Sequence, residues 1–334
     1  EPEPDKSTKI GVGHPPAIRD IPKDARAMEM KRGMSEEGDG KGERERRERP
    51  TKIEIVSLCA YPEGHLLPKF SIPNKEVYAA LHGYGLSVGT KRLDASRPHA
   101  WGKIQMMKDR LRNGNSDWYL WVDCDSYIMD LERTLDSLIL KYAGRLVKEG
   151  GSLVRVETDP SVDLLLTEDS SMLNTGLFFM RPTERNLKFL DRVWGDSDSP
   201  FITHPWWENA AMAWDLLGHV GEDFALEDHS EQMRRNGGKF MKGIYPEGVR
   251  VIPQWEINSY HPVSSRFQHD TWELGRFVLS FSGTPSGSSP EVMNHLYGNY
   301  YRMFCDLNSR VLDLKGLQCI QVEDRLPWTR EDAN

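Results

Sequence analysis

Residues 118–126 read Trp118-Tyr119-Leu120-Trp121-Val122-Asp123-Cys124-Asp125-Ser126. The apolar run at the start of this stretch is too short for a helix and rich in aromatic side chains, which is typical of a buried central strand. Similar patterns predict strands at residues 53–59 and 85–89 and helices at residues 74–84 and 97–112. Strands that alternate with helices predict an α/β fold, with a mostly parallel, Rossmann-like sheet and helices on both faces.

Two carboxylates follow the predicted central strand, at Asp123 and Asp125. In an open α/β sheet, ligands bind beyond the carboxyl ends of the strands, and side chains two residues apart on an extended segment point the same way. Carboxylates that converge repel one another unless a cation lies between them. A hard divalent ion that keeps positions open for phosphate oxygens fits this pattern. Helix capping or turn formation is the alternative explanation for an acidic pair of this kind.

The composition of the chain excludes some classes of protein. The chain has 334 residues, with 43 Lys and Arg residues against 51 Asp and Glu residues, which gives a net charge of −8. A general nucleic-acid binder needs a basic surface, so this class is disfavoured. No stretch reaches the roughly 18 to 20 consecutive apolar residues that cross a bilayer. Residues 1–50 contain no Phe, Trp or Tyr, which predicts a polar stem or tail, disordered or bound to a partner, before a single domain over residues 51–334.

Four cysteines are too few for a disulfide framework in a chain of this length. Cys305 and Cys319 lie close enough in sequence to pair near the C-terminus. Free buried thiols are nevertheless the expectation for all four, because unpaired cysteine is among the most buried residue types.

Several ordered motifs resemble the core signature of glycosyltransferase family 34, which includes fungal α-1,6-mannosyltransferases and α-1,2-galactosyltransferases and plant xyloglucan xylosyltransferases. The first part of the resemblance is carried by Asn74-Lys75, Tyr78, Leu81-His82-Gly83-Tyr84, Arg97-Pro98, Trp101, Lys103 and Trp118 to Ser126. It continues through Leu173-Asn174-Thr175-Gly176, Phe179-Met180-Arg181, Trp207-Glu208-Asn209, Pro253-Gln254 and Asn258-Ser259-Tyr260. The motifs cover roughly residues 52–284.

This resemblance implies a GT-A type domain that binds a nucleotide sugar through manganese and transfers the sugar with retention of anomeric configuration. Asp123 and Asp125 would be the Asp-x-Asp metal ligands, with magnesium as the other candidate ion. Both UDP-sugars and GDP-sugars occur as donors in the family. A divalent ion on the diphosphate would neutralise the charge that develops as the sugar leaves. Lys103 or Arg97 would add positive charge to that diphosphate, although long cationic side chains are more often solvated.

The residues expected around the transferred sugar are Asn174, Glu208 and Asn209. The amide of Asn174 would bind sugar hydroxyls, and Glu208 with Asn209 would supply a polar or acidic group on the face of the sugar. Trp206 and Trp207 precede them and either stack on the acceptor or pack in the core. His82 lies in a segment, His82-Gly83-Tyr84, whose glycine predicts a helix cap rather than a catalytic histidine.

Two departures from the family pattern raise alternatives. Asn209 stands where the family usually has Gln, and Ser280 stands at the position of a metal-ligating His. A hydroxyl is a poorer metal ligand than an imidazole. Either two carboxylates, diphosphate and water hold the metal, or His261, His269 or His295 completes the site, or catalysis has been lost.

Two functions therefore remain open: a metal-dependent retaining glycosyltransferase that acts on a glycan or glycoprotein acceptor, and a catalytically inactive scaffold or glycan-binding subunit. The resemblance implies a location in the Golgi lumen, as the lumenal part of a type II membrane protein whose anchor is absent from this chain. A homo- or hetero-oligomer is compatible with either function.

Overall fold

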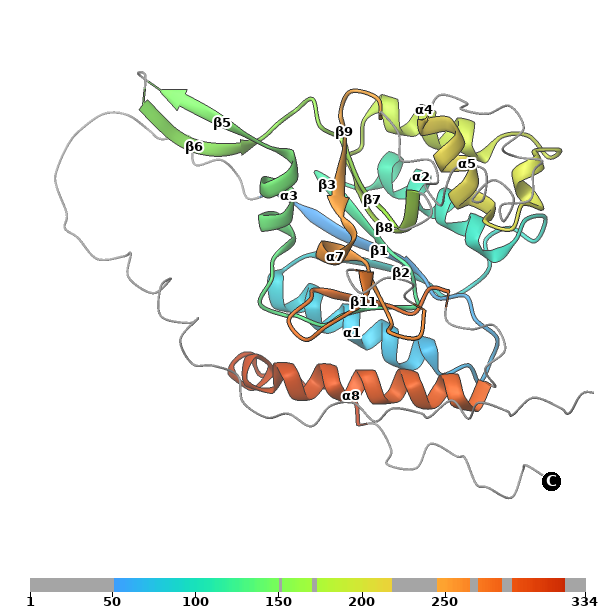
Figure 1. The fold of residues 1–334 in the computed structure, drawn as a ribbon, viewed down its shortest axis with the longest axis vertical. Coiled ribbons are helices and arrows are strands. Elements are labelled where there is room, and N and C mark those ends of the chain that lie inside the picture. Colours follow the sequence, from blue (N-terminus) through green and yellow to red (C-terminus); the bar gives the residue numbers. More distant parts are fainter. Residues whose placement is uncertain are drawn as a thin grey trace, which may run out of the picture. The chain divides into compact units, whose positions relative to one another are not determined.

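The computed structural model describes residues 51–149, 152–169, 173–217, 245–264, 270–283 and 290–321 (Figure 1). The predicted polar stem, residues 1–50, lies outside the described residues.

The main sheet has six strands in the order β2-β1-β3-β8-β7-β9. Parallel pairing joins β2 to β1, β1 to β3 and β7 to β9, whereas β8 is antiparallel to both of its neighbours. The predicted α/β fold with a mostly parallel sheet is therefore confirmed, including the strands expected near residues 53–59, 85–89 and 118–122. The strands are β1 (Ile53–Leu58), β2 (Gly85–Gly89), β3 (Trp118–Val122), β7 (Leu164–Glu168), β8 (Leu173–Met180) and β9 (Val249–Pro253).

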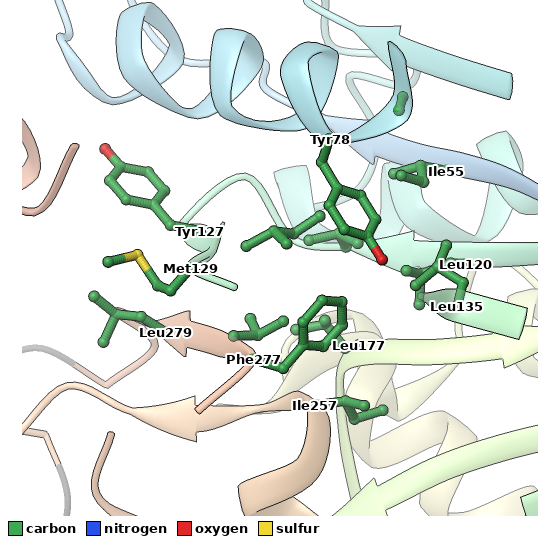
Figure 2. Packing of buried hydrophobic residues seen from close by; sticks show 14 of the residues in the cluster. Ile55, Tyr78, Leu120, Tyr127, Met129, Leu135, Leu177, Ile257, Phe277 and Leu279 are labelled. Carbon is green, nitrogen blue, oxygen red and sulfur yellow. The ribbon is translucent and has the colours of Figure 1, made fainter. Parts of the chain in front are cut away.

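Strand β3 lies in the middle of this sheet, and all five of its side chains are buried. Because side chains alternate along a strand, Leu120 and Val122 pack into one hydrophobic layer and Tyr119 and Trp121 into the other. The first layer lies under α1 (Leu67–His82) and α8 (Pro290–Lys315), and the second under α2 (Gly102–Asn113), α4 (Glu184–Trp194) and α5 (Trp207–Leu216), on the opposite face (Figure 1). Figure 2 shows the first layer, in which Tyr78 packs on Phe277 with the ring centroids 5.7 Å apart.

A smaller sheet continues the chain after the acidic pair. It has the order β10-β11-β4, with β10 (Ser259–Tyr260) parallel to β11 (Val278–Ser280) and β11 antiparallel to β4 (Ser126–Ile128). The pairing sets Ser280 opposite Ser126, so that residues more than 150 positions apart meet beside the acidic pair. The remaining elements are α3 (Leu135–Ala143), the hairpin β5 (Gly144–Glu149) with β6 (Ser152–Thr158), α7 (Gln254–Ile257), η2 (His99–Trp101) and η3 (Pro200–Ile202).

Helix α1 begins earlier than predicted, at Leu67 rather than at residue 74. A proline in the first turn is compatible with a helix, and Leu67 and Phe70 are fully buried, so packing extends the helix across Pro73. Its end is as predicted: Gly83 adopts a left-handed conformation with φ of 70° and caps the helix. The ring of His82 bonds the backbone oxygen of Leu131, in keeping with a structural role.

All four cysteines form disulfides, Cys59 with Cys124 and Cys305 with Cys319. The expectation of free thiols is therefore wrong, and only the second pair was considered from the sequence. Cys59 follows β1 and Cys124 follows β3, so the parallel pairing of these strands brings the two Cα atoms within 5.1 Å. No helix within the described part of the chain combines the length and apolar character needed to span a membrane.

Candidate active site

Two cavities adjoin at the carboxyl end of β3. The larger has a volume of about 440 Å³ and the smaller of about 340 Å³. Both are lined by Lys103, Asp123, Trp207 and Glu208, together with Ala100, so these residues form the wall between them. Open α/β sheets bind ligands beyond the carboxyl ends of their strands. In this chain the two cavities lie at that place.

The smaller cavity lies between the ends of β1 and β3. The loop after β1 contributes Ala60, Tyr61 and Pro62, and the segment after β3 contributes Asp123, Cys124 and Asp125. Both acidic residues of the predicted metal site thus line one space. They do so from a turn rather than from an extended strand, because the backbone N–H of Ser126 donates to the oxygen of Asp123 at 3.2 Å. We call residues 123–126 the carboxylate turn.

The larger cavity is bordered by β8, the start of α5 and the small sheet. Its further lining residues are Asp169, Asn174, Thr175, Gly176, Pro205, Trp206, Asn209, Tyr260, Ser264, Ser282 and Gly283. Most of these groups are polar, which suits a hydroxylated ligand more than an apolar one.

The two carboxylates have different surroundings. Asp123 accepts a hydrogen bond from the indole N–H of Trp121 at 2.6 Å and lies 3.2 Å from the ammonium of Lys103. The Oδ2 atom of Asp125 lies 3.5 Å from the hydroxyl of Ser282. Burial raises the pKa of Asp125, and the nearby charge of Asp123 raises it further. The carboxylate turn therefore holds negative charge that is only partly compensated.

Lys103 holds the centre of the wall between the cavities. Its ammonium lies 3.0 Å from Glu208 Oε1 and 3.2 Å from Asp123 Oδ1, and it donates to the backbone oxygen of Thr175 at 2.9 Å. Burial by itself lowers the pKa of Lys103, but the charges of Asp123 and Glu208 more than offset burial and raise it. Lys103 is therefore a permanent cation that joins the two acidic residues.

Glu208 is almost fully buried at the start of α5, where the N-terminal end of a helix favours negative charge. Lys103 pairs with Oε1, whereas the buried Oε2 atom has no hydrogen-bond partner among the described residues. A buried carboxylate oxygen without a partner is costly, so one on the wall of two cavities is a natural contact for a ligand.

The amides of Asn174 and Asn209 are engaged with the protein. The Oδ1 atom of Asn174 accepts from the backbone N–H of Gly176 and from Asn258. Asn209 accepts from both the backbone N–H and the hydroxyl of Thr175 at 2.8 Å, and donates to the backbone oxygen of Leu173. Both asparagines line the larger cavity, and their bonds fix the backbone of β8 where it borders that cavity.

The side chain of Arg97 lies away from the two cavities that the other predicted site residues line. Its guanidinium donates to the backbone oxygens of Trp194 and Asp196 and lies over the rings of Trp101 and Trp194, with centroid distances of 4.7 and 4.1 Å. It is absent from the lining of both cavities. These contacts hold η2 against the end of α4.

The histidines proposed as a third metal ligand lie elsewhere or outside the described residues. Burial lowers the pKa of His261 to about 4, and its ring packs on Phe281. His295 is exposed on α8, and His269 falls outside the described residues. Ser280 bonds Ser282, whose hydroxyl is the one that approaches Asp125. Among the described residues, no group of three or more His, Cys, Asp or Glu side chains could hold a metal.

Comparison with known proteins identifies the family. Residues 56–289, more than half of the chain, match the model of the galactosyl transferase GMA12/MNN10 family. The chain belongs to this family. Within the GMA12/MNN10 family it is similar to the probable alpha-1,6-mannosyltransferase MNN10 of Saccharomyces cerevisiae, with 30% identity over 37% of this chain and 35% of the relative. A probable alpha-1,2-galactosyltransferase of Schizosaccharomyces pombe, gmh1, is 24% identical over 70% of each chain.

The matches to the first curated relatives span little of their length, 35% and 42% of the two proteins. Among solved structures, a glycosyltransferase involved in glycosylation of the major capsid of PBCV-1 superposes with a TM-score of 0.48 and 15% identity, over 74% of this chain and 98% of that chain.

Sequence reasoning missed one acidic residue of this GMA12/MNN10 family member. Asp169 lines the larger cavity and accepts hydrogen bonds from the hydroxyl of Tyr260 at 2.6 Å and from the amide of Asn174 at 3.1 Å. It directly follows β7, as Asp123 directly follows β3. An acidic residue directly after an apolar strand is therefore the sequence signal that could have identified Asp169.

Proposed function

We propose that this chain is a metal-dependent, retaining glycosyltransferase that moves a sugar from a UDP-sugar or GDP-sugar to a glycan or glycoprotein acceptor. The observation that carries the proposal is the wall of Lys103, Asp123 and Glu208 between two cavities, with Asp123 and Asp125 on the side of the smaller one. Membership of the GMA12/MNN10 family supports a sugar transferase in general terms.

The carboxylate turn fits a hard divalent ion. Asp123 and Asp125 line one cavity, and burial together with the charge of Asp123 raises the pKa of Asp125, a cost that a cation would relieve. Two carboxylates provide only part of a coordination sphere and leave the other positions to diphosphate oxygens and water, which is how Mn²⁺ and Mg²⁺ bind with phosphates. The hydroxyl of Ser282 lies beside Asp125, at 3.5 Å from its Oδ2 atom. When bound, the metal would neutralise negative charge on the diphosphate leaving group.

We assign the smaller cavity to the nucleoside diphosphate and the larger one to the transferred sugar and the acceptor. Tyr61 and Pro62 offer apolar surface for a base in the smaller cavity, whereas the larger cavity is lined by polar side chains and by two tryptophans. Lys103 lies at the junction, where its positive charge would face the diphosphate while it holds Asp123 and Glu208 in place. Arg97 has no part in the proposed site, because its guanidinium binds a turn elsewhere.

Glu208 is the residue we propose to act on the reacting carbon. Its Oε2 atom is buried, lacks a partner among the described residues and belongs to the wall that both cavities share. A carboxylate there would stabilise positive charge on the anomeric carbon as the bond to the diphosphate breaks. Both routes to retention, front-face substitution and a covalent glycosyl ester, can use a carboxylate at this place. Asn174 and Asn209 then act as positioning residues through β8.

The test is a panel of UDP-sugars and GDP-sugars, each with Mn²⁺, measured by thermal stabilisation and by donor hydrolysis. A true donor should raise the melting temperature, because it binds only the native state. NMR of the product should show the anomeric configuration of the donor retained. Glu208→Gln should keep donor stabilisation and lose turnover by about 100-fold or more. If no sugar nucleotide stabilises the protein, the proposal is refuted.

We propose that the chain works in the Golgi lumen, as the lumenal part of a type II membrane protein. The two disulfides support an oxidising compartment, since disulfides are rare in the cytosol.

A non-catalytic scaffold or glycan-binding subunit is the second candidate. It is favoured by Ser280 in place of the family histidine and by the lack of a three-residue metal cluster in the described part of the chain. Calorimetric titration with Mn²⁺, with and without UDP or GDP, separates the two. Binding of the ion together with the nucleotide supports the enzyme, and no heat at any concentration supports the scaffold.

A further inference from the structure

We propose that the disulfide Cys59–Cys124 is a positioning device for the carboxylate turn, which holds Asp123 and Asp125 ready for a divalent cation before the cation binds. The inference rests on the proposed function of these two carboxylates and assigns a role to the residue between them.

The bridge lies inside the acidic pair. Cys124 separates Asp123 from Asp125, and Cys59 directly follows β1. Both cysteines are buried, and their Cα atoms are 5.1 Å apart although 65 positions separate them in sequence. A covalent bond therefore ties the middle of the carboxylate turn to the neighbouring strand of the sheet.

The bridge also joins two walls of the smaller cavity. The loop that begins at Cys59 supplies Ala60, Tyr61 and Pro62 to this cavity, and the carboxylate turn supplies the wall that faces them. The backbone N–H of Cys59 donates to the oxygen of Gly89 at 2.7 Å, which fixes this end of the bridge to β2. The disulfide therefore connects the carboxylates to a firmly held part of the sheet.

Contacts from α1 hold the turn through its backbone. The hydroxyl of Ser71 donates to the oxygen of Cys124 at 2.5 Å, and the ammonium of Lys75 donates to the oxygen of Ser126 at 2.9 Å. Both come from α1. The side chain of Asp123 is held by Trp121 and Lys103, and the disulfide adds a covalent restraint next to Asp125 that comes from the end of β1.

Such a restraint matters because the two carboxylates repel one another. Asp125 Oδ2 is 3.5 Å from the Ser282 hydroxyl, which is longer than an ordinary O–H···O bond, so this contact restrains the carboxylate weakly. Without the bridge, the turn can relax so that the carboxylates of Asp123 and Asp125 move apart. A cation that binds must then bring the two carboxylates together again, which weakens its binding. Groups that orient metal ligands from outside typically change metal affinity by about 10 to 100-fold when they are removed.

The chain contains a matched control for the experiment. The second disulfide, Cys305–Cys319, links α8 to the segment after it, and neither cysteine lines either of the two cavities of the site. Two double variants are compared with the wild type, Cys59→Ala/Cys124→Ala and Cys305→Ala/Cys319→Ala. For each, the Kd of Mn²⁺ is measured by electron paramagnetic resonance in the presence of UDP or GDP, and folding is checked by circular dichroism.

The proposal expects the Kd of Mn²⁺ to rise about tenfold or more in Cys59→Ala/Cys124→Ala and to stay within about twofold of the wild type in the control. Turnover at saturating Mn²⁺ should recover most of its wild-type value, because only the arrangement of the ligands before binding has changed. Equal Mn²⁺ affinity in the wild type and both variants would overturn the proposal. A wild-type chain that binds no Mn²⁺ would instead refute the proposed function itself.

Reduction provides a second measurement if Cys59→Ala/Cys124→Ala does not fold. In the Cys305→Ala/Cys319→Ala protein, Cys59–Cys124 is the remaining disulfide, so a water-soluble phosphine acts on it alone. The S–S bond breaks to give two thiols, and the phosphine is oxidised to the phosphine oxide with oxygen from water. Weaker Mn²⁺ binding by a folded reduced protein supports the proposal. Loss of the fold on reduction would show a purely structural bridge and overturn it.

Discussion

The Nζ atom of Lys103 lies 3.0 Å from the Oε1 atom of Glu208, and both side chains are about 95% buried. The same ammonium lies 3.2 Å from Asp123. One buried cation thus joins the carboxylate that we assign to the metal and the carboxylate that we assign to the sugar. Two acids, the buried Glu208 and the partly exposed Asp123, share this one base, so the site keeps negative charge for which a bound cation is the natural partner.

Removing this lysine should be strongly destabilising. Lys103→Met leaves Glu208 buried without its counter-ion and also removes the cation from the partly exposed Asp123, so the free energy of unfolding should fall by about 3 to 5 kcal/mol. Lys108→Met is the control, because Lys108 lies on the same helix in a more exposed pair with Asp191 and should cost less than about 1 kcal/mol. Urea unfolding of both variants checks the prediction. If the free energy of unfolding falls by less than about 1 kcal/mol in both variants, the ion pairs of Lys103 contribute little to stability.

The second prediction separates activity from stability at Asp125. Asp125→Asn keeps the shape of the side chain but removes a charge that burial and Asp123 disfavour. We expect sugar transfer to fall about 100-fold or more, while the melting temperature stays equal to that of the wild type or rises. Asp306→Asn, at an exposed position of α8, should leave both unchanged. Full turnover by Asp125→Asn would remove this residue from the metal site.

A pH dependence of stability follows from Lys75. This side chain is fully buried on α1, and burial lowers its pKa from 10.5 to about 7, with the charges of Asp125 and Asp123 acting in the opposite direction. Above pH 7 the unfolded chain therefore binds more protons than the native one, so the free energy of unfolding rises with pH until the pKa of the unfolded state is reached.

Relative to Lys75→Met, the wild type should gain about 2 kcal/mol between pH 7 and pH 9. Urea unfolding at pH 7, 8 and 9 measures this difference. Lys91→Met, at an exposed position, should show no such change relative to the wild type. Parallel pH profiles for the wild type and Lys75→Met would show that Lys75 keeps an ordinary pKa.

Trp207 should affect the acceptor more than the donor. It is 42% exposed and lies in the wall between the two cavities, where it borders the proposed acceptor space. Trp207→Ala should raise the KM for the acceptor about tenfold through the loss of stacking on a sugar ring, with little change in donor hydrolysis. Trp255→Ala is the control, because Trp255 is exposed to a similar extent, 46%, but lines neither cavity. Steady-state kinetics with both substrates tests this, and equal effects of the two changes would contradict it.

The strands and the place of the site could be predicted from the sequence because they depend on local patterns. Five apolar residues at positions 118–122 predict a buried strand wherever the chain later goes, and the residues that follow such a strand lie at its ligand-binding end. The cap at Gly83 is local in the same way, since it depends on one residue that adopts positive φ. The extension of α1 to Leu67 was not predicted, because packing rather than propensity produced it.

The partners of the site residues were decided by the tertiary structure alone. Lys103 meets Glu208, 105 positions away, Asn209 binds Thr175 of β8, and Cys59 pairs with Cys124. Arg97, close to Lys103 in sequence, turns to the end of α4 instead. Periodicity in a sequence reports which face of an element is buried, but it carries no information on which distant element will cover that face. Those contacts depend on the order of the strands and on the path of the chain between them.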